Sequence, residues 1–271
     1  MSIRRSNIWY MPSADNAAGF SQSLERGLAI LSAFTPDRPA LGISELARKL
    51  DLTRSTTHRY VATLATLGYL YQDDSTRQYR LGPRVLDLGF SVLGSLELRE
   101  IAAPHLRRLT DTTGHTSNLA IRDDTDVILI DRVRGRPGRY HHLEYTLHIG
   151  SRLPSYCSST GKALLAFLPR RDLDGLLDRI ELVRRGPRTL TDKGALLAEL
   201  EEVRRTGVAV NDEELDSALR SIAAPVRSRS GEVVAAVNVS IPWSPVAMNE
   251  LVTELGPTIQ AAAQQIAARV V

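Results

Sequence analysis

The stretch DLTRSTTHRYVATLATLGYL, residues 51–70, places a polar front end directly before an apolar repeat at helical spacing. Its first turn is rich in hydrogen-bond donors: Arg54, Ser55, Thr56, Thr57, His58 and Arg59. Apolar side chains then recur so that one side of a helix would be buried: Tyr60, Val61, Leu64 and Leu67. This distribution is typical of a helix whose N-terminal residues meet DNA bases and phosphates while the rest packs on its own domain. Arginine can hold guanine or a phosphate through two hydrogen bonds, and hydroxyl groups can reach either.

Two shorter helices are predicted before this one. In SLERGLAILSAF, Ser23 is the expected N-cap, and four apolar residues share one face: Leu24, Leu28, Leu31 and Phe34. The break TPDRPALG ends that helix, and Ser44 opens the next with SELARKL. Residues 51–53 connect it to the third helix, which Gly68 ends. Three short helices with this spacing predict a helix-turn-helix.

A two-stranded wing is predicted to follow. In YLYQDDSTRQYRLG, residues 69–82, apolar and aromatic residues flank a DDST turn. Arg77 and Gln78 would lie near the tip, and they join the first turn of the third helix as candidate DNA contacts. Asp73 and Asp74 suit the turn through local hydrogen bonds rather than acid-base chemistry. The alternative to DNA binding is a small helical domain with a solvated polar helix end.

Charge is distributed unevenly along the chain. Residues 1–82 hold ten Arg or Lys against seven Asp or Glu, and the remainder holds 24 against 24, so the whole net charge of +3 lies in the first segment. A small basic segment joined to a neutral larger one is typical of a nucleic-acid module attached to another domain. A chance imbalance of three charges is the other interpretation.

The rest of the chain predicts an α+β domain. A helical stretch starts at Pro83 and is interrupted at Gly94 and Pro104, and strands follow after Gly114. Strands flanked by helices at both ends favour a sensor-like domain with one antiparallel sheet. The predicted strands are HTSNLAIRD, DVILIDRVRG, Arg139–Tyr145, SIAAPVRSRS and GEVVAAVNVS, and the predicted helices are Thr160–Leu168, Asp172–Arg179, Asp192–Thr206 and residues 244–271. The expected organisation is a flexible arm over 1–21, a winged helix-turn-helix over 22–84, a linker helix over 85–98 and a second domain over 99–271.

Several classes of protein are excluded by composition. The 271 residues contain no apolar run long enough to span a membrane and no signal-like N-terminal stretch, so a cytoplasmic protein without membrane attachment is expected. Cys157 is the only cysteine, and the six histidines form no HxxxH spacing, so neither disulfides nor a metal site is predicted.

No catalytic constellation is predicted either. SSTGKALL is not a phosphate loop, because Tyr156 stands where a glycine and Ala163 where a Ser or Thr would be needed. Cys157 could be a nucleophile with His141, His142 or His148 as its base, but a lone cysteine in an apolar-flanked loop is usually structural. We therefore expect no enzyme and no cofactor. The basic run from Arg132 to Arg139 is typical of a solvated hairpin end. It could instead supply an arginine to bind a carboxylate or to form an interface, and the sequence leaves these alternatives open.

Taken together, the motifs resemble the IclR family of transcriptional regulators. In the first half, the resemblance is carried by SLERGLAILSAF, ISELARKLDLTRSTTHRYVATLATLGYL and YRLGPRVLDLG. In the second half, it is carried by DRV at 131–133, GKALLAFLP at 161–169, NDEEL at 211–215 and RSIAAPVR at 220–227. The likeness extends from Ser23 to the C-terminus and implies a DNA-binding domain joined by a helix to a GAF-like domain that binds a small organic effector.

Within the family, RLPSYCSSTGKALLA is most similar to the regulators of aromatic catabolism, those of the protocatechuate and β-ketoadipate pathway. The resemblance implies an effector such as protocatechuate, 4-hydroxybenzoate or β-ketoadipate. A non-aromatic effector such as glyoxylate or pyruvate is the alternative. Outside a regulator, an enzyme on a GAF-like scaffold or a protein-interaction adaptor would be the competing functions.

The resemblance also implies positions for an effector pocket. These are Cys157, Ser158, Ser159, Thr160, Asn211, Leu219, Ser221, Asn238 and Ser240. The sequence departs from the glyoxylate-responsive pattern because Asn211 replaces an aspartate, Ser221 a cysteine and Asn238 a serine, which argues against a two-carbon acid. The hydroxyl and amide groups could supply donors for a small carboxylate, helped by the backbone N–H groups that lead into the Thr160 helix.

The resemblance finally implies assembly. A dimer would bind a partly palindromic double-stranded operator, and the effector domains would pair further into a homotetramer. Any one of the pocket serines could instead be a helix cap or part of a turn.

Overall fold

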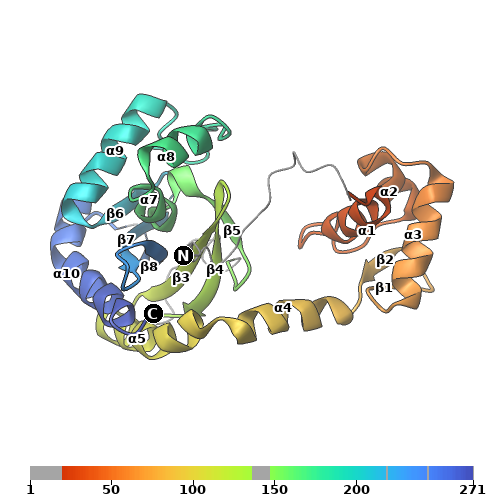
Figure 1. The fold of residues 1–271 in the computed structure, drawn as a ribbon, viewed down its shortest axis with the longest axis horizontal. Helices are drawn as coiled ribbons and strands as arrows, with labels where there is room; N and C mark the ends of the chain where they lie inside the picture. The colour runs from red at the N-terminus through yellow and green to blue at the C-terminus, as the bar shows by residue number, and fades with distance from the viewer. Residues whose placement is uncertain (1–19, 136–146, 218, 243, 271) are drawn as a thin grey trace, which may run out of the picture. The chain divides into compact units, whose positions relative to one another are not determined.

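A computed structural model describes residues 20–135, 147–217, 219–242 and 244–270. The chain divides between Ser95 and Leu96 into two compact units. Figure 1 shows the helices and the small hairpin of the first unit and the larger sheet of the second. The predicted strand Arg139–Tyr145, the histidines at 141 and 142 and the N-terminal arm up to residue 19 lie outside the described residues.

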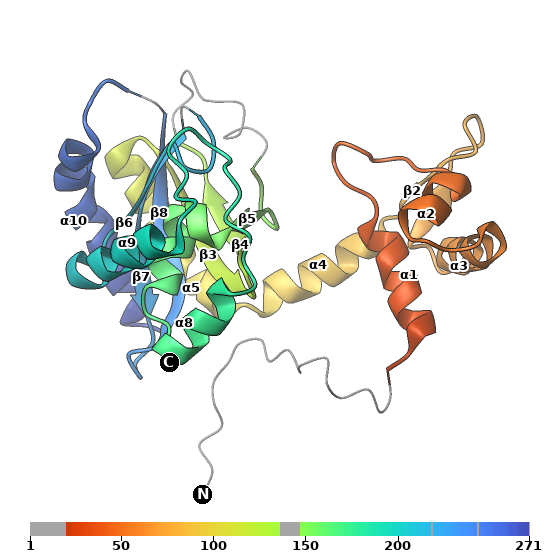
Figure 2. The same cartoon turned by 90° about the horizontal axis from the view of Figure 1, so that it is seen from above.

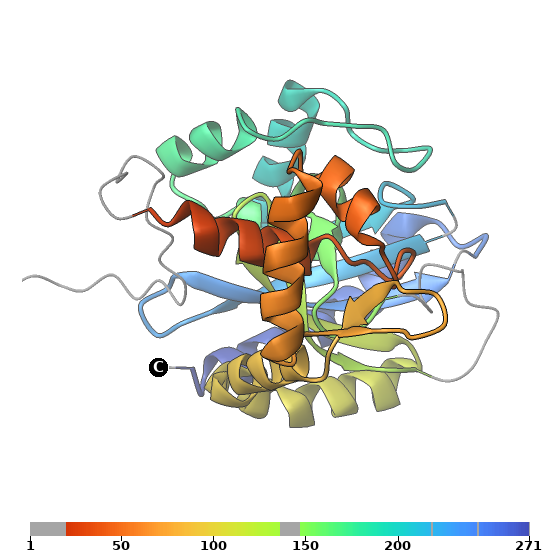
Figure 3. The ribbon, with the colours of Figure 1, turned by 90° about the vertical axis from the view of Figure 1, so that its right-hand side faces the viewer.

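The first unit is a winged helix-turn-helix, as predicted. Its elements are α1 (Gln22–Ser32), α2 (Ile43–Lys49), α3 (Arg54–Thr66), β1 (Leu70–Gln72), β2 (Tyr79–Leu81) and α4 (Arg84–Ser95). The strands β1 and β2 pair antiparallel, with Tyr71 opposite Arg80, and Leu41 forms a bridge with Tyr79 that ties the loop before α2 to the wing. In Figure 3, α1 crosses α3 and the wing lies beside α3.

The core of this unit corrects the predicted face of α1. Ile30, Ala33 and Phe34 are buried, whereas Leu24 is 63% and Leu28 55% exposed. Of the predicted face, Phe34 and Leu31 therefore contribute to the core, whereas Leu24 and Leu28 do not. Periodicity identifies an apolar face but not what covers it.

The starts of the first two helices were also predicted two residues late. Ser21 accepts a hydrogen bond from Leu24 N and caps α1, two residues before Ser23. Helix α2 begins after Gly42, whose N–H donates to the Glu45 carboxylate at 2.9 Å, so Ser44 lies within the helix. A glycine at the N-cap is acceptable when a glutamate three residues later satisfies its backbone N–H.

The turn between α2 and α3 sets the start of the recognition helix. Asp51 adopts a left-handed conformation with φ of 51°, and Leu52 N donates to Ala47 O at 2.9 Å. Thr53 then caps α3, because its Oγ1 accepts from Thr56 N at 3.1 Å. This turn brings the polar first turn of α3 to the surface while Val61, two turns later, is fully buried.

The second unit is an α+β domain with a six-stranded antiparallel sheet. Strand order is β5-β4-β3-β8-β7-β6. The strands are β3 (Thr116–Asp123), β4 (Asp126–Val133), β5 (Arg152–Pro154), β6 (Ala209–Asp212), β7 (Leu219–Arg227) and β8 (Val233–Pro242). The helices are α5 (Glu97–Thr113), α7 (Ser159–Leu165), α8 (Arg170–Leu177), α9 (Lys193–Thr206) and α10 (Met248–Ala267), with a 3₁₀ turn at Ser155–Cys157.

This architecture confirms the predicted fold class and four of its strands. The three-residue β5 and the four-residue β6 were not predicted. The helical stretch after Pro83 breaks at Leu96 rather than at Gly94, and Pro104 lies inside α5. Pro104 is tolerated there because the helix around it is held by its packing on β3 and β4.

The sheet has helices on both faces. Helices α5 and α10 lie side by side and pack on one face, while α7 packs on the other face with α9 behind it (Figures 1 and 2). Successive side chains of β3 show the two directions: Ser117 Oγ lies 2.7 Å from Thr110 Oγ1 of α5, and Asn118 turns to the α7 face. The candidate site lies between this second face and α7.

Candidate functional site

The first turn of α3 presents most of its predicted DNA contacts to solvent. Arg54, Ser55, His58 and Arg59 are exposed, and Thr56 is half-buried. Thr57 departs from the prediction: its side chain is fully buried, and its hydroxyl donates to Thr53 O at 3.0 Å. Thr57 therefore stabilises the start of the helix and does not present its side chain to DNA.

The wing presents the other two predicted contacts. Arg77 is exposed, with a left-handed φ of 58°, and Gln78 is half-buried. The turn before them is held by Asp73, whose Oδ1 accepts from Ser75 N at 2.9 Å and Thr76 N at 3.0 Å. These hydrogen bonds, with one from the Ser75 hydroxyl as the largest cause, lower the pKa of Asp73 to about 2. Asp73 therefore has the turn-stabilising role that its sequence position predicted.

In the second unit, a small cavity lies between α7 and the sheet. Its volume is about 20 Å³, which is room for one or two water molecules. The lining residues are Asn118, Leu129, Leu147, Leu153, Ser158, Ser159, Thr160, Asn211, Leu215, Leu219, Ser221, Asn238 and Ser240. The structure thus brings together eight of the nine positions predicted for the effector pocket. A ring-sized ligand would require the walls to move apart.

Sheet register explains why distant residues meet here. Asn211 stands opposite Ser221, Ser221 opposite Ser240, and Asn118 opposite Asn238. Residues paired in this way on neighbouring antiparallel strands point to the same face. Four strands therefore contribute polar side chains to one patch of the sheet.

Helix α7 closes the cavity from the other side. Ser158 caps it, since its Oγ accepts from Gly161 N at 3.2 Å and donates to Pro154 O at 2.8 Å. Gly161 packs so closely on the Ser155 backbone that an added Cβ would lie 2.2 Å from Ser155 O. The glycine therefore allows the 158–160 segment to reach the sheet, where Ser159 Oγ lies 2.7 Å from Ser221 Oγ.

Hydrogen bonds join the polar side chains of the sheet. Arg132 Nη1 donates to Asn118 Oδ1 at 2.7 Å, and Asn118 Nδ2 donates to Asn238 Oδ1 at 2.8 Å and to Ser240 Oγ at 3.3 Å. Asn238 Nδ2 donates in turn to Ser159 Oγ at 3.5 Å. Sequence reasoning missed Asn118, although an asparagine in the apolar strand TSNLAIR was a signal, because a buried amide requires polar partners.

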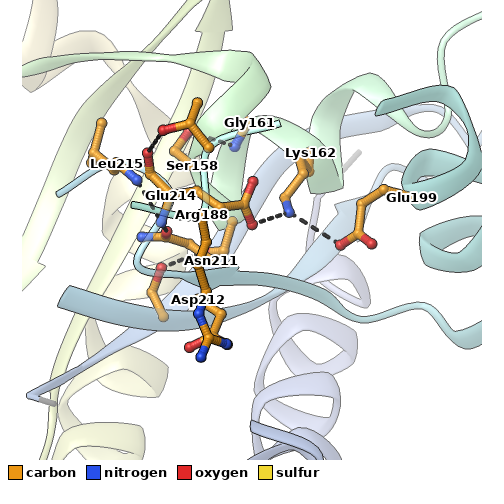
Figure 4. A network of polar contacts seen from close by, with 12 residues as sticks. Ser158, Gly161, Lys162, Arg188, Glu199, Asn211, Asp212, Glu214 and Leu215 are labelled. Atoms are coloured by element: carbon orange, nitrogen blue, oxygen red, sulfur yellow. Dashed lines mark hydrogen bonds and ion pairs between the residues drawn. The ribbon is translucent and has the colours of Figure 1, made fainter. Parts of the chain in front are cut away.

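A buried ion pair holds the wall beside Asn211 (Figure 4). Lys162 Nζ lies 2.6 Å from Glu214 Oε1 and 3.1 Å from Glu199 Oε1, and the Lys162 side chain is fully buried. Burial raises the pKa of Glu214, while the Lys162 ammonium opposes that shift. Asn211 Oδ1 accepts from Glu214 N at 2.8 Å and Leu215 N at 3.3 Å, so the pair also fixes two lining residues, Asn211 and Leu215.

Cys157, the ninth predicted pocket position, does not line the cavity. It is fully buried in the hydrophobic core, because the 3₁₀ turn directs it away from the cavity that Ser158 and Ser159 face. Burial raises the pKa of its thiol to about 12. His148, a base considered for it, is exposed and contacts Ser151 Oγ at 3.1 Å. The arrangement therefore does not support a cysteine nucleophile.

Metal-binding groups and membrane-spanning helices are both absent from the described parts of the chain. Among those residues, no group of three or more His, Cys, Asp or Glu side chains is arranged to hold a metal ion. No helix there is both long and apolar enough to cross a bilayer.

Comparisons with known proteins agree with both units. Residues 23–74 match the IclR helix-turn-helix domain, and residues 90–268 match the C-terminal domain of the bacterial transcriptional regulator IclR. The chain is 37% identical over 248 residues to the Pca regulon regulatory protein of Pseudomonas putida, covering 91% of this chain and 83% of that protein.

Solved structures are similar over nearly the whole chain. A candidate transcriptional regulator from Rhodococcus sp. RHA1 has a TM-score of 0.77 and 39% identity, covering 92% of this chain and 98% of that one. An IclR homologue from Microbacterium hydrocarbonoxydans, solved in complex with 4-hydroxybenzoate, has a TM-score of 0.76 and 28% identity, covering 91% of this chain and 98% of that one. With its winged helix-turn-helix, its effector-type domain and these matches, the chain belongs to the IclR family of DNA-binding transcriptional regulators, and it is not an enzyme.

Proposed function

We propose that this regulator is controlled by a small aromatic acid, such as protocatechuate or 4-hydroxybenzoate, or by β-ketoadipate, bound in the cavity between α7 and the sheet. The observation that carries the proposal is the convergence of hydroxyl and amide groups from α7 and four strands on one patch lined by leucines. A few converging polar groups within an apolar lining are typical of small-molecule sites. The effector-binding residues proposed are Ser158, Ser159, Thr160, Asn211, Leu219, Ser221, Asn238 and Ser240.

Two relatives support an effector from aromatic catabolism. One is the Pca regulon regulatory protein, and the other is the homologue solved with 4-hydroxybenzoate. The leucines among the lining residues favour a ligand with an apolar body, because a two-carbon acid would leave Leu129, Leu147 and Leu153 without a partner. Glyoxylate or pyruvate is the alternative effector.

The DNA-binding surface proposed consists of Arg54, Ser55, Thr56, His58 and Arg59 at the start of α3, with Arg77 and Gln78 on the wing. The exposed arginines would contact phosphates or guanine, and the hydroxyls would contact either. A DNA-binding regulator of this kind acts in the cytoplasm, where the operator DNA lies.

We infer that the DNA-binding unit pairs with a second copy. Leu24 and Leu28, four residues apart on α1, are more than half exposed, and so are Leu86 and Phe90 on α4. Apolar residues repeated at helical spacing on an exposed face mark an interface. A two-fold dimer would place two α3 helices on the half-sites of a partly palindromic operator, and pairing of effector units would give a tetramer.

Effector binding would act by shifting populations between arrangements of the DNA-binding units. Such a shift requires the ligand to bind one arrangement more tightly than the other. The small cavity supports this scheme, because a ring-sized ligand would favour a form in which the walls have moved apart.

The test is a thermal-shift and calorimetry screen of the full chain against protocatechuate, 4-hydroxybenzoate, β-ketoadipate, glyoxylate and pyruvate. We expect binding of one of the first three, and we expect Ser221→Leu to abolish it while operator binding is retained. Ser230→Leu, the same change at an exposed turn, is the matched control and should leave ligand binding intact. Binding of glyoxylate or pyruvate alone would refute the aromatic-catabolism assignment.

A further inference from the structure

The three asparagines that line the cavity share one property: a donor of the protein occupies each carbonyl oxygen. Arg132 donates to Asn118 Oδ1, and Asn118 donates to Asn238 Oδ1. Asn211 Oδ1 accepts from the backbone N–H groups of Glu214 and Leu215. The acceptor half of each amide is therefore engaged within the protein. The Nδ2 groups of Asn211 and Asn238 are the ones that can serve a ligand, because Asn118 Nδ2 already donates to Asn238 Oδ1 and Ser240 Oγ.

Arg132 determines the direction of the first two amides. A guanidinium group only donates hydrogen bonds, so Asn118 must turn its oxygen toward Arg132 and its Nδ2 toward Asn238. Asn238 must then turn its oxygen toward Asn118, which directs its Nδ2 toward Ser159 on α7. The orientation of an amide is otherwise ambiguous, since its O and N can exchange places without changing its shape. One cation thus orients a chain of hydrogen bonds from β4 through β3 and β8 to α7.

Arg132 keeps this orientation beside the carboxylate that precedes it in the sequence. Its neighbour Asp131 points to the opposite face of β4, where it lies 3.8 Å from Arg99 Nε of α5. None of the lining residues in the described part of the chain is an aspartate or glutamate. The cavity therefore offers N–H and O–H groups, and the Arg132 guanidinium donates to the asparagine that forms part of its wall.

We propose that Arg132, through Asn118 and Asn238, determines the specificity of the cavity for a carboxylate group of its effector. A carboxylate carries only acceptors, so it can receive donors from every direction, and hydrogen bonds to a charged acceptor are the stronger kind. A carboxamide of the same shape carries two hydrogens on its nitrogen, which would face the protein's own donors. The inference rests on the proposal that the cavity is the effector site, and it assigns to Arg132 the carboxylate-directed role that the sequence left open.

The test compares acids with their matched amides. Affinities of 4-hydroxybenzoate and 4-hydroxybenzamide, and of pyruvate and pyruvamide, are measured by calorimetry on the full-length protein. We expect wild type to prefer the acid by about 10- to 100-fold, the range for hydrogen bonds to charged groups. Arg132→Met should remove most of this preference. Arg132→Lys should keep part of it, because lysine retains the charge and a donor but lacks the planar, paired N–H groups of the guanidinium.

Two further variants separate this role from a general effect on folding. Asn118→Asp keeps the shape but replaces the Nδ2 donor with an oxygen, so acid binding should be lost while the thermal transition remains cooperative. Arg122→Met removes an exposed arginine from β3 and should leave the acid-to-amide ratio unchanged.

Each outcome supports or contradicts the proposed role of Arg132 in carboxylate specificity. An acid-to-amide ratio that is the same in wild type and Arg132→Met would overturn it, although acid-dependent control of operator binding would still stand. Equal affinity of wild type for acid and amide, or no binding of either acid, would also overturn it. In these cases, operator binding by the same preparations shows whether the DNA-binding assignment survives by itself.

Discussion

Removal of the buried Lys162 ammonium should destabilise the protein strongly, and the loss should depend on pH. Lys162 is fully buried and Glu214 is 5% exposed, with 2.6 Å between Nζ and Oε1. Lys162→Met would leave the Glu214 carboxylate without its cation in a site where burial already raises its pKa. Breaking a buried pair by removing one partner costs about 3–5 kcal/mol. Lys193→Met is the matched control, because Lys193 and Asp178 form an exposed pair, for which the loss should stay below about 1 kcal/mol.

The pH dependence follows from the direction of the Glu214 shift. Without Lys162, the pKa of Glu214 should rise further above its usual value near 4.3, so the folded variant binds a proton that the unfolded chain has released. Its stability relative to wild type should therefore recover as the pH falls from about 8 toward 5. The measurement is the free energy of unfolding of the variant and the wild type at about pH 8 and pH 5, obtained from urea titrations followed by circular dichroism. The double variant Lys162→Met, Glu214→Met should recover most of the loss. A loss of stability that is equal at about pH 8 and pH 5 and persists in the double variant would contradict this role of the buried ion pair.

Three further predictions concern other parts of the chain. Arg54→Ala should weaken operator binding by about 1–3 kcal/mol and lower its salt dependence, as measured by fluorescence anisotropy; unchanged affinity would remove Arg54 from the interface. The thiol of Cys157 has a pKa of about 12, so about one molecule in ten thousand carries the thiolate near pH 8. We therefore expect Cys157 to react with a thiol reagent only after unfolding. Rapid labelling of the native protein would contradict its burial. Leu28→Glu should place a charge in the proposed α1 interface and lower both the mass seen in sedimentation and operator affinity, whereas an unchanged mass would argue against that interface.

Much of the fold could be predicted because its signals are local. The polar first turn and apolar remainder of α3, the Asp73 turn of the wing and the long alternating or apolar strands each depend on residues close in sequence. The two short strands β5 and β6 were missed, because three or four residues are too few to show a period. The core position predicted for Leu24 and Leu28 on α1 was wrong, because an apolar stripe is equally compatible with the chain's own core and with a surface that a partner covers.

The candidate site was predicted through the family resemblance more than through residue spacing. Resemblance identified the positions on α7, β6, β7 and β8, which the structure brings together around the cavity. It did not identify Asn118, whose partner Asn238 is 120 residues away and meets it only through the β3–β8 register. It also placed Cys157 in the pocket, since which residues of a short loop face a cavity depends on the 3₁₀ turn at Ser155–Cys157 rather than on residue type.

We propose that a small acid controls how tightly this regulator binds DNA. The most direct measurement is fluorescence anisotropy of labelled intergenic DNA flanking the chain's own gene, titrated with the full-length protein with and without 4-hydroxybenzoate, protocatechuate and β-ketoadipate. We expect salt-sensitive, sequence-dependent binding whose affinity changes with at least one of these acids in the wild type and with none of them in Ser221→Leu. Binding that no acid alters would contradict effector control, and the absence of any salt-sensitive duplex binding would favour a protein-interaction adaptor instead.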